Sequence, residues 1–286
     1  MFAVMKWSGI ALGAALLLAT LAVAAIYGAS EYQLRRYADA PAVRLAVPGS
    51  AAAIAQGRHV AVTRGCFGCH GKDLGGKVFF DDRWEGRLVA ANITLKIRHY
   101  TDPQLARILR HGVRPDGTAV IGMPSATFHY LSDQDLGRLI AFLRSVPKSD
   151  NNLPATHLRL LGRVEILRHP YRLAAHDIQQ IGPPMNPGAP AATVAYGNYL
   201  AHSVCTECHG LDLDGEEGFT PSLIVAKAYS LEKFTRLMRH GIALDGRDPA
   251  LMGEVARGRF SHFDDTEIAA LYAYLQARDG LTGRRQ

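Results

Sequence analysis

The strongest constraint on this chain is a short motif that occurs twice, in which two cysteines stand three residues apart and a histidine follows directly. The first copy, "CFGCH", covers residues 66–70, and the second, "CTECH", covers residues 205–209. These two copies hold all four cysteines of the 286-residue chain, so no cysteine is left over. The fold is therefore expected to present each motif as one unit, with both sulfurs and the imidazole acting on the same group.

Cys-x-x-Cys-His is the attachment signature of a c-type haem. Residues i and i+3 of a helical turn lie on one face, so both thiols can bond the two vinyl groups of one porphyrin edge. The motifs predict two covalently bound c-type haems, attached through Cys66 and Cys69 and through Cys205 and Cys208. The histidines that follow, His70 and His209, are predicted to be the proximal ligands of the two haem irons.

Two other uses of paired cysteines fit the sequence less well. A thioredoxin-type site has one such pair inside a βαβ pattern and does not require the histidine. A structural zinc site joins two Cys-x-x-Cys pairs about 15–20 residues apart, whereas these pairs lie in different halves of the chain. A redox disulfide and a zinc site remain the alternatives to haem.

The two motifs head two similar stretches of sequence. "LARILRHGVRPDG" at 105–117 parallels "KFTRLMRHGIALDG" at 233–246, and "LSDQDLGRLIAFLRSV" at 131–146 parallels "FDDTEIAALYAYLQAR" at 263–278. The last pair begins with a Ser or Asp N-cap and an acidic first turn, and its apolar residues recur at helical spacing. Each half is therefore predicted to be all-α, with a motif-bearing helix, a long loop, a helix, a loop and a final helix.

The repeat also selects candidates for the second axial ligand of each iron. Met123 and Met252 are 129 residues apart, match each other, and each precede the last predicted helix on a loop. A thioether is a soft iron ligand that raises the reduction potential of a haem, so these two methionines are the predicted distal ligands. Met238 aligns with Leu109 instead and is predicted to pack in the core.

Ligation by two histidines is the rival prediction. His111 and His240 are also 129 residues apart, each in the sequence "RHG". However, each stands at the end of a predicted helix just before Gly112 or Gly241, where His suits the last turn and Gly the position after it. Helix capping is therefore the preferred interpretation, and replacement of a methionine ligand by one of these histidines stays open.

With these motifs in place, residues 51–147 and 193–278 resemble class I cytochrome c domains, in which helices wrap one haem. In that family a proline carbonyl usually receives the ring N–H of the proximal histidine; Pro221 matches that place, and Ala91 is its counterpart in the first half. The stretch from "AANIT" to the last helix is also similar to the cytochrome subunits of membrane-bound dehydrogenases of alcohols and sugar acids. Those subunits typically carry three haems, whereas two motifs stand here.

Residues 8–29 carry no charge. This run is long enough to cross a bilayer as a helix, which takes ~20 residues. We expect an uncleaved single-pass anchor in the bacterial inner (cytoplasmic) membrane, with the haem domains facing the periplasm. A cleaved signal peptide, ending at Ala22-Val23-Ala24, is the alternative. The predicted organisation is an anchor, a tether, a first cytochrome domain, a linker and a second cytochrome domain, at 1–30, 31–50, 51–147, 148–192 and 193–286. Residues 158–174 of the linker are expected to form a helix, ended by Pro170, that either packs between the domains or wraps the first one.

Charge and ligation together define the expected function. Residues 51–147 hold 13 basic and 8 acidic side chains, and residues 196–286 hold 10 basic and 13 acidic ones. The chain has no basic tract with interleaved aromatic residues, so nucleic acid binding is not expected. The opposite net charges of the two halves fit either two protein partners or two solvated surfaces. An iron with both axial positions filled has no site for a substrate, so the expected function is single-electron transfer without catalysis. The expected partners are redox proteins: a dehydrogenase, a quinol-oxidising complex or a terminal oxidase. The alternatives are a dihaem oxidoreductase, such as a peroxidase or a sulfur-compound dehydrogenase, and a disulfide-stapled binding module.

Overall fold

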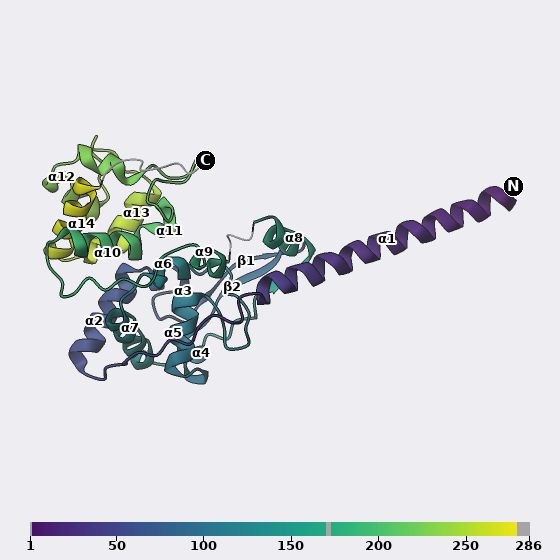
Figure 1. The fold of residues 1–286 in the computed structure, drawn as a ribbon, viewed down its shortest axis with the longest axis horizontal. Helices are drawn as coiled ribbons and strands as arrows, with labels where there is room; N and C mark the ends of the chain where they lie inside the picture. The colour runs from purple at the N-terminus through teal and green to yellow at the C-terminus, as the bar shows by residue number, and fades with distance from the viewer. Residues whose placement is uncertain (1, 170–172, 279–286) are drawn as a thin grey trace.

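The computed structural model describes residues 2–169 and 173–278, and most of the described chain is helical. Figure 1 shows a long N-terminal helix projecting from a first helical body, with a second body, in green and yellow, on the far side from that helix. The first domain holds α2 (Ala51–Thr63), α3 (Cys66–His70), α4 (Ile93–Lys96), η1 (Ile97–His99), α5 (Asp102–His111), α6 (Ser125–His129) and α7 (Asp133–Ser145). The second holds α10 (Val194–Val204), α11 (Thr206–His209), η3 (Leu223–Ala228), α12 (Leu231–His240), α13 (Leu251–Gly258), η4 (Phe260–His262) and α14 (Asp265–Ala277). This mostly helical pair of domains after an apolar helix confirms the predicted fold class.

The N-terminal helix α1 (Phe2–Arg35) is long and apolar enough to cross a membrane. Its stretch Trp7–Arg35 contains an 18-residue window with a mean hydropathy of 2.4, and none of that window is buried. At about 1.5 Å of rise per residue, the uncharged run 8–29 is roughly 33 Å long, close to the ~30 Å hydrocarbon core of a bilayer. These properties fit a membrane anchor or a signal sequence.

Each domain is built on one close helix pair, α2 on α7 in the first and α10 on α14 in the second. A glycine permits each approach, because a Cβ built on Gly57 would lie 1.9 Å from the carbonyl oxygen of Arg138, and one on Gly197 would lie 1.9 Å from that of Ala270. The predicted N-caps are confirmed, since Ser132 caps α7 and the Asp264 capping box starts α14. The apolar side chains of both pairs belong to one continuous core that extends through both domains.

A small antiparallel sheet departs from the predicted purely helical first domain. Strands β1 (Lys77–Asp82) and β2 (Gly86–Ala90) form a hairpin, and β3 (His157–Leu158) from the linker pairs with β2. The Asp82 carboxylate accepts hydrogen bonds from the backbone N–H groups of Trp84 and Glu85, which fixes the hairpin turn. The sequence predicts a long loop here, because a short hairpin leaves little periodic signal.

The linker wraps the first domain instead of forming a helix between the domains. Its helix α8 (Leu160–Arg168) packs along α1, and α9 (Ala174–Ile178) packs against α6. The tether after α1 also belongs to this body, because Leu34 and Tyr37 are buried in a second apolar cluster with Ile166 of α8. Pro170, the predicted end of the helix, lies outside the described residues.

The close approach at Gly197 makes a stability prediction. Replacing Gly197 by Ala forces α10 away from α14, and we expect the free energy of unfolding to fall by about 1–3 kcal/mol, the usual cost of overpacking. Thermal unfolding followed by far-UV circular dichroism measures this loss. Gly258→Ala is the matched control, because its added methyl group meets nothing within 4 Å. Equal melting temperatures for the two variants would contradict the packing account.

Candidate functional site

The first motif begins where α2 ends. Arg64 closes α2, and Gly65 follows in the left-handed region with φ 77°, so the chain turns sharply and starts again as α3. This short helix carries Cys66, which is buried, and Cys69, which is half-buried. Residues i and i+3 of one helical turn share a face, so both thiols are placed to bond one flat group.

The second motif follows α10 almost without a break. Cys205 has helical backbone angles and leads directly into α11, which contains Cys208 and His209. All four cysteines of the chain are free thiols, so neither motif forms a disulfide in this structure. Burial raises the pKa of Cys66 and of Cys205 to about 12. Redox-active cysteines have a lowered pKa instead, so these environments disfavour the thioredoxin-type alternative.

The two motif histidines are held alike, each by a backbone carbonyl. The Nδ1–H of His70 donates to the carbonyl oxygen of Ala91 at 2.8 Å, and the Nδ1–H of His209 donates to that of Pro221 at 2.8 Å. This confirms both carbonyl partners expected from the family resemblance. Burial lowers the pKa of each imidazole and keeps it neutral, and a bonded Nδ1–H fixes the tautomer that leaves Nε2 free for a metal. Two thiols on one helical turn and one such imidazole fit a c-type haem.

The two candidate distal methionines differ in their local structure. Met123 lies on a loop, between Gly122 in the left-handed region and Pro124. Met252 was expected on a similar loop, but it lies in the first turn of α13, whereas Met123 stands two residues before α6. Both side chains are partly buried and pack against the apolar core that contains Cys66, so both remain the predicted distal ligands. Met238 is a core residue as predicted, with 2% of its surface exposed.

The rival histidines stand where the capping interpretation put them. His111 and His240 are the last residues of α5 and α12, and both following glycines adopt the left-handed conformation. His240 is exposed. The ring of His111 lies 5.7 Å from that of His129, and burial together with the neighbouring cations lowers its pKa to about 4.

A further histidine of the first domain, His129, is held inside the fold. It is buried, and its Nδ1 and Nε2 lie 3.1 and 3.0 Å from the backbone carbonyl oxygens of Arg110 and Gly182. Since a carbonyl only accepts, these two contacts cannot both be made by a neutral ring. The bond that is made ties α6 to the helix before it or to the linker after it.

A charged contact that the sequence analysis missed joins the two motifs across the domain boundary. Arg259, next to η4 of the second domain, forms an ion pair with Glu207 at 2.6 Å inside the second motif. The same guanidinium lies against the backbone of Gly65, where a Cβ would come within 2.2 Å of its Cζ atom. The Arg259 side chain therefore pairs with the second motif and lies beside the start of the first, although local sequence gives no signal for a contact between such distant segments.

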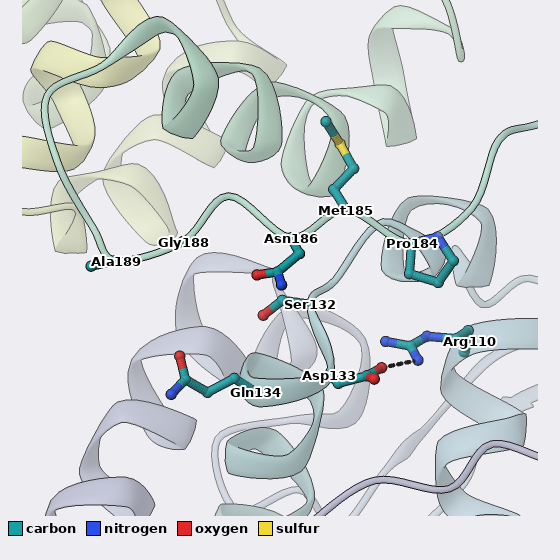
Figure 2. Close-up of a pocket in the computed structure, with 9 residues that line it drawn as sticks. All are labelled: Arg110, Ser132, Asp133, Gln134, Pro184, Met185, Asn186, Gly188 and Ala189. Atoms are coloured by element: carbon teal, nitrogen blue, oxygen red, sulfur yellow. Dashed lines mark hydrogen bonds and ion pairs between the residues drawn. The ribbon is translucent and has the colours of Figure 1, made fainter.

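A separate cleft of about 770 Å³ lies between the linker and the start of α7. Figure 2 shows Met185 and Pro184 on the linker side and the ion pair of Arg110 with Asp133 on the other. Neither motif lines this cleft. The haem-type chemistry of the chain therefore lies elsewhere, at the two motifs.

Comparison with known proteins assigns both halves to related families. Residues 52–143 match the family described as "Cytochrome C oxidase, cbb3-type, subunit III", and residues 194–279 match the family described as "Cytochrome c". The chain is also similar to the fructose dehydrogenase cytochrome subunit of Gluconobacter japonicus, at 32% identity over 116 residues. That alignment covers 37% of this chain and 24% of the relative, so the chain spans about a quarter of that protein's length.

The attachment chemistry makes a stoichiometric prediction. Replacing Cys205 and Cys208 together by Ala removes both thioether bonds of the second motif, and we expect one covalent haem per chain where the unaltered chain has two. Denaturing mass spectrometry and the pyridine haemochrome spectrum count the haems. The matched variant lacks Cys66 and Cys69 and is expected to retain the other haem. Two covalent haems in either variant would contradict the assignment.

Proposed function

This chain carries two cytochrome c domains, and we propose that it is a membrane-anchored dihaem cytochrome that transfers single electrons between redox proteins. The observation that carries the proposal is the matched pair of histidine–carbonyl bonds, at 2.8 Å in both domains. A haem at each motif supplies reversible one-electron chemistry when bound. The motif thiols hold it covalently, and each carbonyl fixes the orientation and basicity of the histidine ligand.

A methionine as the second protein ligand of each haem iron would make the chain a carrier, because no coordination position would remain for a substrate. Met123 and Met252 are the residues we assign to this role, on their matching positions in the repeat and their shared contact with the core. The dihaem oxidoreductase alternative requires one open or displaceable position. No free cysteine outside the motifs exists to supply an exchangeable thiolate ligand.

Ligand replacement tests this assignment. Met123→His exchanges a thioether for a more basic imidazole, which favours the oxidised iron. We expect the midpoint potential of the first haem alone to fall by at least ~59 mV, a tenfold change in its reduction equilibrium. Met252→His is expected to do the same to the second haem, and potentiometric titration of the visible spectrum measures both.

The spectrum of the unaltered protein provides the control. The oxidised form is expected to show the weak near-infrared sulfur-to-iron band at both haems, and the reduced form to bind CO slowly. A high-spin haem, or rapid CO binding at one site, would favour the oxidoreductase instead. An unchanged potential in Met123→His would remove Met123 as a ligand.

The packing around the end of α1 supports a membrane-anchored arrangement. Arg163 of α8 donates to the Ser30 hydroxyl at 2.8 Å, and its guanidinium lies 4.4 Å from the centre of the Tyr27 ring. Further along, Ile166 and Leu34 belong to one apolar cluster. Helix α8 therefore runs parallel to α1, and its first turn lies level with the end of the uncharged run.

The side chains at that level suit a bilayer surface. Leu160 and Leu161 of α8 and Trp84 of the hairpin are exposed, and the backbone N–H of Leu161 donates to the carbonyl of Trp84. The Arg83 guanidinium stacks 4.6 Å from the Trp84 ring. Tryptophan and arginine are common at the membrane–water interface, so this corner is placed to rest on the membrane.

The anchor makes a prediction about the mature protein. An uncleaved α1 leaves the chain in the membrane fraction after an alkaline carbonate wash, with an intact mass that includes residues 1–24. Cleavage at Ala22-Val23-Ala24 gives a chain that begins at residue 25 and washes off. Intact-mass measurement of the washed membranes and of the wash supernatant separates the two, and the shortened mass in the supernatant would refute the anchor.

The partners we propose are redox proteins at the membrane. The named relative is the cytochrome subunit of a fructose dehydrogenase, and this supports a dehydrogenase as electron donor. A quinol-oxidising complex is the alternative donor, and a terminal oxidase is the acceptor that completes the route in the respiratory chain. Copurification from detergent-solubilised membranes identifies the partner directly.

A further inference from the structure

The two domains pack against each other with approximate two-fold symmetry. His59 of α2 contacts Glu267, the third residue of α14, at 2.9 Å. In return, the Tyr199 hydroxyl of α10 donates to Asp135, the third residue of α7, at 2.5 Å. His59 and Tyr199 each stand two residues after the glycine of their helix, so the contacts are equivalent and reciprocal. Reciprocal contacts of this kind define an isologous interface, as in a two-fold dimer.

The centre of this interface lies beside the first motif. Arg64 is 4% exposed and donates to the hydroxyl groups of Thr63 and Ser203, at 2.8 and 3.1 Å. Thr63 and Ser203 are equivalent residues, six positions after Gly57 and Gly197. The Arg64 side chain therefore joins equivalent positions of the two domains, and each position lies just before a motif.

The symmetry breaks at one pair of positions that touch the motifs. Thr127 and Arg259 are equivalent, because each stands five residues before the N-cap of the last helix of its domain. On one side the hydroxyl groups of Thr127 and of Thr206 in the second motif form a hydrogen bond at 3.0 Å, a neutral contact. On the other side Arg259 lies against Gly65, the residue just before the first motif, and pairs with Glu207 of the second.

The Arg259–Glu207 pair is mostly shielded from water. The side chains are 19% and 23% exposed, respectively. Charges that are partly buried act more strongly and are screened less by salt than exposed ones. The Arg259 charge lies near both motifs, since it pairs with Glu207 inside the second motif and lies beside Gly65 and Gly68 at the first.

We propose that the Arg259–Glu207 pair is a shared electrostatic control that sets the reduction potentials of both haem sites together. This inference rests on the proposed function, because it requires a haem at each motif. An oxidised haem carries one more positive charge than a reduced one. The Arg259 cation therefore favours the reduced state at both motifs, and the Glu207 carboxylate favours the oxidised state.

Charge-neutral variants test the control in both directions. Arg259→Gln is expected to lower both midpoint potentials, and Glu207→Gln to raise both. We expect each reduction equilibrium to change two- to tenfold, where tenfold corresponds to about 59 mV for one electron. Potentiometric titration measures both haems in one sample, and Arg259→Lys, which keeps the charge, is expected to leave the potentials close to those of the unaltered protein.

Arg239→Gln is the matched control. Arg239 pairs with Asp265, the first residue of α14, at 2.6 Å. Because Asp265 is 95% exposed, water screens this pair, and we expect no shift in either potential. A purely structural pair would lower the melting temperature and move both potentials in the same direction in Arg259→Gln and Glu207→Gln. That result, or a shift confined to one haem, would overturn the proposal. A haemochrome count below two per chain would instead show that the proposed function itself fails.

Discussion

Each haem site depends on one backbone hydrogen bond that brings a distant loop to its motif. The N–H of Ile93 donates to the carbonyl of Leu74 at 3.0 Å, and that of Leu223 donates to Leu213 at 2.9 Å. Both leucines have positive φ angles, 58° and 63°, which costs roughly 1–2 kcal/mol in a residue with a side chain. Both are fully buried, and burying a leucine contributes about 1.5–3 kcal/mol. Core packing thus holds a strained turn, and the turn sets the carbonyl that orients the proximal histidine.

The sequence was sufficient for the parts of this design that depend on short spacing. The motif predicted the attachment group, the repeat predicted two domains, and local capping rules placed Ser132 and Asp264 correctly. The carbonyl partners Ala91 and Pro221 came from the resemblance to cytochrome c domains, and the structure confirms both. These features were predictable because each is encoded by a few neighbouring residues or by a family pattern.

The remaining features depend on contacts between distant segments, which periodicity does not encode. The β1–β2 hairpin is short, and the linker completes its sheet, so neither part was visible alone. The backbone strain at Leu74 and Leu213 follows from the core around them, although leucine ordinarily avoids positive φ. Arg259 illustrates the limit most clearly, because it is an ordinary polar residue in sequence and becomes a shared contact only when the domains pack.

The internal two-fold packing also explains how two similar domains come to have different surroundings. Their reciprocal contacts use the same faces of both domains. Residues 51–147 carry more basic than acidic side chains, and residues 196–286 carry more acidic than basic ones. The linker and α8 bind the first domain to α1, while the second domain lies on the far side of the molecule from that helix (Figure 1). Complementary charge steers the encounter of two proteins. The opposite net charges of the two domains fit oppositely charged protein partners, which suits the proposed passage of electrons from one protein to another; two independently solvated surfaces are the alternative.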